Sequence, residues 1–220
     1  MKRRVAILIS GRGSNMAALL DAASVPDFPA EIALVLSNRP GAAGLERARA
    51  ARLPAVCIDH RDFNGDRAAH EAAIDQALRT EGTEIVCLAG YMRLMTPFLV
   101  GAWRGRMLNI HPSLLPAFPG LDTHARALAA GVNLHGCTVH VVTEDMDAGP
   151  ILAQAAVPVL PGDTPDSLAA RVLCQEHLIY PAALAAFAAG VAGPNPAAAA
   201  ALANPLPWPV AHHKTLQDPI

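Results

Sequence analysis

The sequence has few aromatic residues, very little lysine and no long run of basic residues. Aromatic side chains make up 4% of its 220 residues, and the 17 basic residues include only two lysines. Proteins that bind single-stranded nucleic acid usually line a basic groove with aromatic side chains on which bases stack. This composition, with a formal net charge of −2, predicts that nucleic acid is not a partner.

Cysteine is also scarce. The four cysteines occur singly, with no Cys-x-x-Cys pair: Cys57, Cys87, Cys137 and Cys174. This spacing argues against a zinc site or a disulfide framework, and it predicts buried thiols in a reducing compartment.

Long apolar runs are absent as well. No apolar stretch reaches the roughly 20 residues of a membrane span without a glycine, a proline or a charge. The N-terminal run Val5–Ile9 stops at a Ser-Gly-Arg-Gly sequence with no small-residue cleavage site, so it predicts a strand and not a signal peptide. We therefore expect a cytoplasmic protein without a membrane association.

The 52% of hydrophobic residues are enough to fill one sizeable core. Short apolar runs predict strands at Val5–Ile9, Ile32–Leu36, Ala55–Ile58, Glu84–Gly90 and Gly105–Ile110. Helical composition separates the first four of them, at Met16–Ala23, Gly44–Arg52 and Arg67–Thr80. Strands that alternate with helical segments of about a dozen residues favour an α/β fold. We expect a mostly parallel, doubly wound, Rossmann-like sheet with helices on both faces.

The second half of the chain continues this pattern. It predicts a helix capped by Thr123 that runs to Ala130, and then strands at His135–Val142 and Ile151–Val157. A long helix follows at Asp166–Ala189. We expect residues 1–190 to form a single domain and the Ala/Pro-rich residues 191–220 to form an extended strap or a tail.

The end of the fifth predicted strand carries two polar side chains on one face. Asn109 and His111 are two residues apart, and a strand alternates its side chains between two faces. Pro112 then ends the strand, which leaves the imidazole at the edge where open α/β sheets bind their ligands. A carboxamide beside an imidazole is the minimum set for polarising a carbonyl while moving protons.

A glycine-rich turn, Ser10 to Asn15, joins the first strand to a helix. Unpaired backbone N–H groups and the positive helix end make such a turn an anion site, with phosphate as the natural occupant. A tight turn with Ser14 or Asn15 as the helix N-cap explains the same residues. The dinucleotide fingerprint lacks its third glycine, because Met16 stands there, although Arg39 leaves a dehydrogenase open as an alternative.

Four histidines within thirty residues raise the alternative of a metal site: His111, His124, His135 and His140. Their spacings match no tight helical metal motif, and no cysteine completes the set, so scattered structural histidines are favoured. A nucleophilic triad of Ser113, His111 and Asp147 is a further alternative. Because Ser113 follows a proline outside any nucleophile elbow, its predicted role is to shape the loop.

Five segments occur in the same order as in the phosphoribosylglycinamide formyltransferases, which the chain resembles from about Arg4 to Phe187. They are Ile7–Asn15, Leu88–Arg93, Leu108–Pro116, Met146–Pro150 and Gln175–Pro181. The Asn-x-His segment with its prolines is shared with other folate-dependent formyltransferases. The glycine-rich start and the Gln-Glu-His segment together single out this family.

The resemblance implies formyl transfer from 10-formyltetrahydrofolate to the amine of glycinamide ribonucleotide, in purine synthesis and without a metal. It implies three catalytic residues, Asn109, His111 and Asp147. It implies that the nucleotide is bound by Gly13, Ser14, Asn15 and Glu176. It implies that the folate is bound by Arg67, Met92, Arg93, Leu94, Met95, Asn109, Thr143, Glu144, Asp145, Met146 and Asp147.

The chemistry agrees with the three catalytic residues. An amine that attacks a formyl carbon creates an oxyanion, which the Asn109 amide and a protonated His111 can stabilise by hydrogen bonds. Histidine can also exchange protons near neutral pH. Asp147 next to the imidazole would favour its charged form by charge attraction and receive a proton through water.

Two features depart from the family pattern. Ala117 stands where a basic residue often follows Leu-Leu-Pro, which puts a peripheral charge contact in doubt, and the segment after Ala189 matches nothing in the family. We expect small-molecule substrates and a monomer or a homodimer.

Three alternatives remain open. A formyltetrahydrofolate hydrolase usually carries an extra N-terminal domain, and a methionyl-tRNA formyltransferase carries an extra basic C-terminal domain; we expect neither domain here. A non-catalytic nucleotide-binding module would leave Asn109, His111 and Asp147 together without a purpose.

Overall fold

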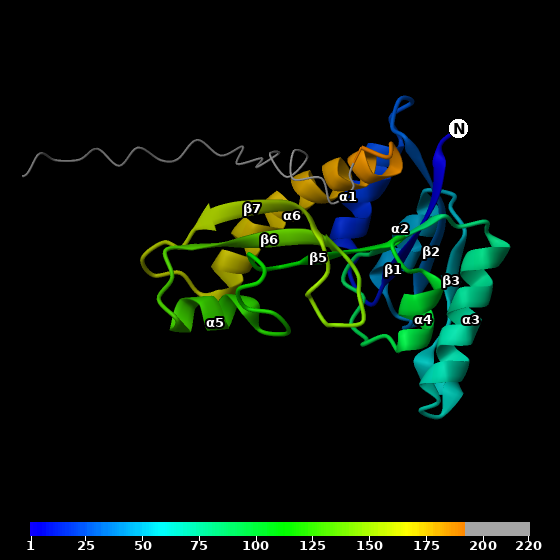
Figure 1. Ribbon diagram of the computed structural model, residues 1–220, viewed down its shortest axis with the longest axis horizontal. Helices are drawn as coiled ribbons and strands as arrows, with labels where there is room; N and C mark the ends of the chain where they lie inside the picture. The colour runs from blue at the N-terminus through cyan, green and yellow to red at the C-terminus, as the bar shows by residue number, and fades with distance from the viewer. Residues whose placement is uncertain (192–220) are drawn as a thin grey trace, which may run out of the picture.

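Seven strands form one sheet in the computed structural model, which describes residues 1–191 (Figure 1). Their order across the sheet is β3-β2-β1-β4-β5-β6-β7. The strands are β1 (Arg3–Ile9), β2 (Ala30–Ser37), β3 (Ala55–Cys57), β4 (Ile85–Leu88), β5 (Met107–His111), β6 (Leu134–Val141) and β7 (Ile151–Pro158). Strands β1 to β5 run parallel, whereas β6 and β7 pair in antiparallel fashion. The predicted mostly parallel sheet is confirmed.

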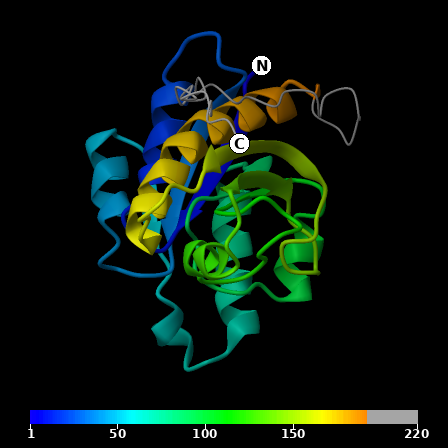
Figure 2. The same ribbon diagram turned by 90° about the vertical axis from the view of Figure 1, so that its left-hand side faces the viewer.

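Helices cover both faces of the sheet, as predicted for a doubly wound fold. They are α1 (Ser14–Ala23), α2 (Ala43–Ala50), α3 (Arg67–Thr80), α4 (Pro97–Ala102), α5 (Thr123–Ala129) and α6 (Pro165–Ala188), with a 3-10 helix η1 (His60–Phe63). One core contains buried side chains of α1, α2 and α6, and the other contains those of α3 and α4. Figure 2 shows α6, in yellow and orange, beside α1 in blue.

The alternation of side chains along β1 explains why both faces need cover. Val5, Ile7 and Ile9 point into the first core, and Ala6 and Leu8 point into the second. All five side chains are fully buried. A strand buried on both faces reads as a continuous apolar run, which is why the sequence predicted it so clearly.

Strand β1 also sets the position of the ligand-binding edge. It lies between β2 and β4, so the chain leaves the carboxyl ends of β1 and β4 in opposite directions across the sheet. A crevice forms at such a switch point. The turn that begins at Ser10 follows β1 there, and the backbone N–H of Ser10 donates to the carbonyl oxygen of Gly90 after β4 at 3.1 Å.

Every predicted strand and helix is present within two residues of its expected bounds. The sequence reading missed the short elements α4 and η1, which have too few residues to show a period. It was wrong about Thr123, because the N-cap of α5 is Asp122 and no side chain caps that helix. The hydroxyl of Thr123 donates instead to the carbonyl oxygen of Pro112 at 2.7 Å, which ties α5 to the end of β5.

Among the described residues, no helix is both long enough and apolar enough to cross a membrane. The Ala/Pro-rich segment predicted as a strap or tail, 191–220, lies outside the described residues apart from Val191.

Candidate active site

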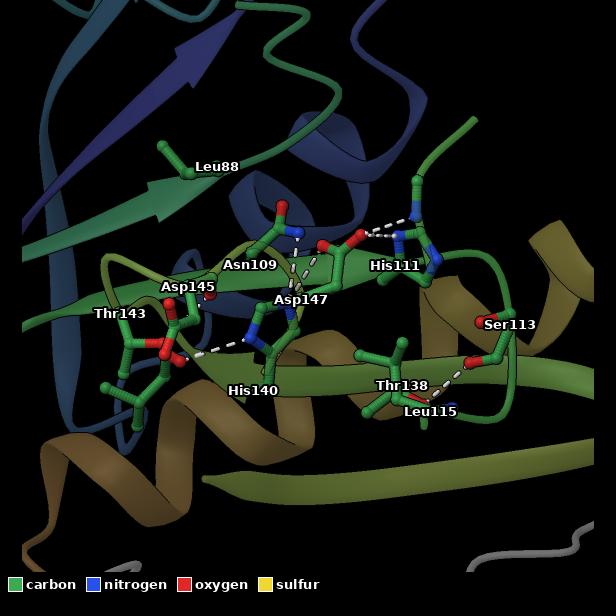
Figure 3. A network of polar contacts seen from close by, with 12 residues as sticks. Leu88, Asn109, His111, Ser113, Leu115, Thr138, His140, Thr143, Asp145 and Asp147 are labelled. Carbon is green, nitrogen blue, oxygen red and sulfur yellow. Dashed lines mark hydrogen bonds and ion pairs between the residues drawn. The ribbon is translucent and has the colours of Figure 1, made fainter. Parts of the chain in front are cut away.

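The carboxyl end of β5 carries Asn109 and His111 on one face, as the spacing predicts (Figure 3). The strand ends at His111, and Pro112 begins the following loop. In the antiparallel pairing of β5 with β6, Asn109 lies opposite His140 and His111 lies opposite Thr138. His111 is 5% exposed. Strand register therefore adds a second imidazole to the predicted pair.

Asp147 reaches the two imidazoles from the loop between β6 and β7. Its Oδ2 lies 3.4 Å from Nδ1 of His111, and its Oδ1 lies 3.8 Å from Nε2 of His140. The backbone N–H of Gly120 donates to Oδ2 at 2.8 Å. Figure 3 shows the carboxylate between the two rings. The predicted group of Asn109, His111 and Asp147 thus comes together in space.

A close backbone contact brings the Asp147 loop back onto β6. A Cβ atom on Gly149 would lie 1.7 Å from the carbonyl oxygen of Val141, so only glycine fits there. Next to this contact, the N–H of Val141 donates to the carbonyl oxygen of Pro150 at 2.9 Å. The Asp-Ala-Gly-Pro sequence therefore closes the loop and directs the carboxylate of Asp147 inward.

His140 orients the amide of Asn109. Nδ1 of His140 lies 3.1 Å from the carbonyl oxygen of Val141, which can only accept, so Nδ1 carries the proton. Burial lowers the pKa of His140, which favours the neutral ring. Its unprotonated Nε2 then accepts from Nδ2 of Asn109 at 3.2 Å. One N–H of Asn109 is used in this way, and the other remains for a substrate oxygen.

Both ring nitrogens of His111 face acceptors. Nε2 lies 3.1 Å from the carbonyl oxygen of Phe118, and Nδ1 faces the Asp147 carboxylate. An imidazole can take up and release a proton at its ring nitrogens. The site therefore combines a proton-carrying ring, an adjacent carboxylate and a fixed amide donor, as acyl transfer to an amine requires.

The loop after His111 is held by Thr138 on β6. The Thr138 hydroxyl donates to the carbonyl oxygen of Ser113 at 2.7 Å and accepts from the N–H of Leu115 at 3.0 Å. Ser113 is fully buried, and its own hydroxyl donates to the carbonyl oxygen of Ala117 at 2.7 Å. Ser113 therefore shapes the loop, and the alternative of a nucleophilic triad is wrong.

The amino end of α1 borders a hollow of about 330 Å³ at the switch point. Gly13 is the N-cap, with a φ of 71°, and no side chain caps the helix. The alternative in which Ser14 or Asn15 acts as the cap is therefore wrong. Arg12 and Arg39 also line the hollow. Within residues 1–191 neither guanidinium forms a hydrogen bond or an ion pair, so two cations face the open amino end of a helix.

Asn15 and Glu176 lie side by side although they are 161 residues apart in the sequence. Nδ2 of Asn15 donates to Oε2 of Glu176 at 2.6 Å. Burial raises the pKa of Glu176, and the bond from Asn15 opposes that rise. Oδ1 of Asn15 is buried without a partner in the described part of the chain, and Asn15 lines the hollow. An unsatisfied acceptor at this wall is suited to a hydroxyl or an amide of a ligand.

Apart from Asn109 and Asp147 in the catalytic group, the predicted folate-contact residues divide into three groups. Residues 92–95 follow β4, where Met92 and Leu94 are each 63% exposed and Arg93 and Met95 are half-buried. Residues 143–146 form an exposed loop that leads to Asp147. Arg67 stands apart: it is exposed at the first position of α3, and among residues 1–191 no hydrogen bond or ion pair joins it to another predicted site residue.

The loop of residues 143–146 has polar contacts of its own. The Thr143 hydroxyl donates to the carbonyl oxygen of Asp145 at 3.1 Å, and Glu144 pairs with Arg104 at 2.9 Å. Met146 is 57% exposed next to Asp147. The apolar side chains of Met146, Met92 and Leu94 therefore remain exposed.

The four clustered histidines divide into two pairs. His111 and His140 flank Asp147, whereas His124 and His135 pack edge to face with ring centroids 5.2 Å apart. Within the described residues, no three His, Cys, Asp or Glu side chains are arranged to hold a metal ion.

Sequence reasoning underestimated three residues of this region. The sequence favours a structural role for His140, indicates Arg39 only for the dehydrogenase alternative and predicts no role for Arg12. The two-residue spacing of Thr138 and His140 is a signal for His140 that the sequence contains. It places both side chains on one face of β6, the same face as Asn109 and His111 on the paired strand β5.

The sequence model of the formyl transferase family matches residues 3–184. The chain belongs to the formyl transferase family. A crystal structure of the formyl transferase named phosphoribosylglycinamide formyltransferase, from Brucella melitensis, is 56% identical with a TM-score of 0.82, and the match covers 88% of this chain and 99% of that one. The phosphoribosylglycinamide formyltransferase of Escherichia coli (strain K12) is 43% identical over 186 residues, which are 84% of this chain and 87% of that protein.

A larger protein contains a similar formyl transferase segment. The trifunctional purine biosynthetic protein adenosine-3 of Bos taurus is 50% identical over 189 residues. These residues are 86% of this chain but 19% of the bovine protein. The chain therefore spans about a fifth of the length of that relative.

Proposed function

We propose that this formyl transferase moves the formyl group of 10-formyltetrahydrofolate to the amine of N1-(5-phospho-D-ribosyl)glycinamide, in de novo purine synthesis. The products are the N-formyl nucleotide and tetrahydrofolate. The observation that carries the proposal is the group of Asn109, His111 and Asp147 at the same sheet edge as the two-arginine hollow. Relatives that match over most of their own length bear the name of this activity.

Asn109 is the fixed donor in the proposed reaction. When the amine attacks the formyl carbon, negative charge develops on the formyl oxygen. The N–H of Asn109 that His140 leaves free can donate to that oxygen, and the bond to His140 keeps the amide from rotating away. A donor already in place needs no reorganisation during the reaction, which is the source of its catalytic value.

His111 and Asp147 move the protons. The attacking amine must lose a proton, and the folate nitrogen must gain one as its bond to the formyl carbon breaks. In this proposal His111 exchanges the Phe118 carbonyl for the substrate at Nε2, donates to the developing oxyanion and carries a proton between the two nitrogens, while Asp147 stays beside Nδ1 and stabilises the charged ring. The number of protons balances, because the one lost by the amine ends on the departing nitrogen.

The substrates are proposed to lie on either side of this centre. The nucleotide phosphate occupies the hollow at α1, where Gly13, Ser14 and Asn15 present backbone N–H groups, and Arg12 and Arg39 neutralise its charge. Glu176, held by Asn15, accepts bonds from the ribose hydroxyls. The exposed apolar surface of the 92–95 and 143–146 segments suits a flat ring of the folate.

The deciding experiment mixes the purified full-length chain with glycinamide ribonucleotide and a formyl-folate analogue whose deformylation changes its absorbance. We expect deformylated folate to appear only when the nucleotide is present, together with one equivalent of formylated nucleotide. Free formate without nucleotide would indicate a hydrolase instead. Transfer to charged initiator tRNA, and not to the nucleotide, would indicate the tRNA enzyme.

The expected compartment is the cytoplasm, where small folates and nucleotides meet, and the expected assembly is a monomer or a homodimer. The thiols of Cys87 and Cys137 are buried as predicted, whereas the prediction is wrong for Cys57, which is half-buried, and for Cys174, which is exposed. All four are free, which is compatible with a reducing compartment.

A further inference from the structure

Glu71 is a buried carboxylate outside the catalytic group, and both of its oxygens bind one residue. It lies on α3 and is 4% exposed. Oε1 accepts from the backbone N–H of Thr96 at 2.7 Å, and Oε2 accepts from the Thr96 hydroxyl at 2.5 Å. Hydrogen bonds to an ionised acceptor are about twice as strong as neutral ones. Glu71 therefore ties Thr96 firmly to α3.

Thr96 occupies the N-cap position of α4, yet its side chain does not cap that helix. A threonine N-cap normally accepts a bond from a backbone N–H of the first helical turn. Here the hydroxyl is directed to Glu71 instead. The position of Thr96 therefore depends on the carboxylate of α3 more than on the helix that Thr96 begins.

The segment proposed to contact the folate, residues 92–95, lies within the segment 91–96, which Thr96 ends. Near the other end of this segment, the N–H of Met92 donates to the hydroxyl of Ser10 at 2.8 Å. Between these two anchors the backbone forms neither helix nor strand, and Met92 and Leu94 are the most exposed side chains of the segment. Apolar side chains on an irregular backbone present a defined surface only if the ends of the segment are held.

We propose that Glu71 is a positioning residue for the folate, because its two bonds to Thr96 hold residues 91–96 in the shape that presents Met92 and Leu94 to the ligand. The inference rests on the proposed function. Without the carboxylate, the segment gains conformational freedom that folate binding must then remove. The result is a larger loss of affinity for the folate than for the nucleotide, whose hollow shares only Met92 with this segment.

Asp75 is a matched control on the same helix. Residues four positions apart share a helix face, and Oδ1 of Asp75 accepts from the indole N–H of Trp103 at 2.9 Å. Glu71 and Asp75 thus join α3 to the two ends of α4, but Asp75 binds the end away from residues 91–96. Removing Asp75 shows what loosening α4 does by itself.

The test compares Glu71→Ala, Glu71→Gln and Asp75→Ala in the full-length chain, with KM measured for each substrate. Glu71→Ala should raise the KM for the formyl-folate about 10- to 100-fold, because two bonds to a charged group are lost. The KM for the nucleotide should change by less than about threefold. Met92 is the one residue of the 91–96 segment that lines the nucleotide hollow, and its N–H keeps the bond to Ser10. Glutamine can accept from the Thr96 N–H and donate to its hydroxyl, so Glu71→Gln should restore most of the folate affinity.

Hydrogen exchange of a peptide spanning residues 91–96 provides a readout without substrate. Exchange there should be faster in Glu71→Ala and unchanged in Asp75→Ala. An unchanged folate KM in Glu71→Ala, or an equal rise in both alanine variants, would overturn the proposal. If the wild-type chain transferred no formyl group, the proposed function would fail, and hydrogen exchange would still decide whether Glu71 holds the segment.

Discussion

Asp147 has three contacts, and an asparagine could keep the shape of all three. Its Oδ2 accepts from Gly120 and faces Nδ1 of His111, while its Oδ1 faces Nε2 of His140. An amide oxygen can replace Oδ2, and the amide nitrogen can take the place of Oδ1 beside the His140 ring. The backbone φ of 54° is in the left-handed region, which asparagine also tolerates. Only the negative charge is lost.

We therefore predict that Asp147→Asn lowers kcat and leaves the fold intact. General acid–base assistance is typically worth about 10²–10⁴-fold, and kcat should fall within that range. The dissociation constants of both substrates and the melting temperature should change little. Single-turnover kinetics together with calorimetry measure these quantities separately.

A double-mutant cycle with His111→Asn tests whether the two residues act as one unit. If they do, the double variant should be little slower than the slower single variant. If the rate loss of the double variant equalled the product of the two single losses, Asp147 would act independently of His111.

Arg39 is predicted to recognise the substrate phosphate, because it lines the hollow at α1 without a partner among the described residues. Arg39→Ala should raise the KM for the nucleotide by roughly tenfold or more, as expected for one charge-assisted hydrogen bond. The weak reaction of the phosphate-free glycinamide riboside should be unaffected.

Arg49→Ala is the control for that experiment, since Arg49 forms an exposed ion pair with Glu46 on α2. Arg49→Ala should change the KM of neither substrate. If Arg39→Ala lowered the affinity for both substrates equally, Arg39 would have a structural role.

At the scale of elements, β6 and β7 hold the loop that follows β5. The Thr138 hydroxyl on β6 contacts Ser113 and Leu115 and also accepts from Nε2 of Gln154 on β7 at 2.9 Å. Nε2 of Gln154 further donates to the carbonyl oxygen of Leu115 at 2.8 Å. The same loop carries the Phe118 carbonyl that binds the His111 ring. The antiparallel pair thus positions the catalytic imidazole through the loop.

Thr138→Val removes this hydroxyl without changing the shape of the side chain. It leaves the N–H of Leu115 and the carbonyl of Ser113 without their partner in a buried place, so the free energy of unfolding should fall by roughly 2–4 kcal/mol. We also expect kcat to fall about tenfold, because the His111 ring loses its support. Urea unfolding and steady-state kinetics provide the two measurements.

Thr138→Ser keeps the hydroxyl and should remain close to wild type in both measurements. A serine variant as impaired as the valine variant would mean that the methyl group, and not the hydrogen bonds, is what the loop requires.

At the scale of the whole molecule, buried histidines make the fold sensitive to acid. His135 is 1% exposed and packs against His124 and Phe118. Burial, with a smaller effect of the His124 charge, lowers the pKa of His135 from 6.5 to about 4. Since the folded pKa is below the unfolded one, stability is complete above about pH 6.5 and declines as pH falls toward about 4.

We predict that His135→Phe reduces this acid dependence while keeping a flat ring in the same place. Between pH 7 and pH 5 the wild type should lose about 2 kcal/mol more unfolding free energy than the variant, as an upper limit for a shift of this size. Chemical denaturation of both proteins at the two pH values measures the difference. If both proteins lost the same unfolding free energy between the two pH values, the assigned role of His135 would be contradicted, whatever the stability of the variant at neutral pH.

The local pattern of the chain was enough to predict most of the fold. The apolar run of β1, the two-residue spacing of Asn109 and His111, and the glycine-rich turn before α1 all report on neighbours along the backbone. Backbone geometry fixes the period of a strand and the open amino end of a helix, so these features follow from the sequence near them. The predicted group of Asn109, His111 and Asp147 also needed a known family pattern, because Asp147 is on a distant loop.

Tertiary structure alone decided which distant residues meet. The pairing register of β5 with β6 places His140 beside Asn109, and the packing of α6 on α1 places Glu176 beside Asn15. The bond from Glu71 to Thr96 likewise depends on how α3 packs against α4. These contacts have no local signal, because register and helix packing are set by the burial of the whole apolar core and not by the few residues that happen to touch.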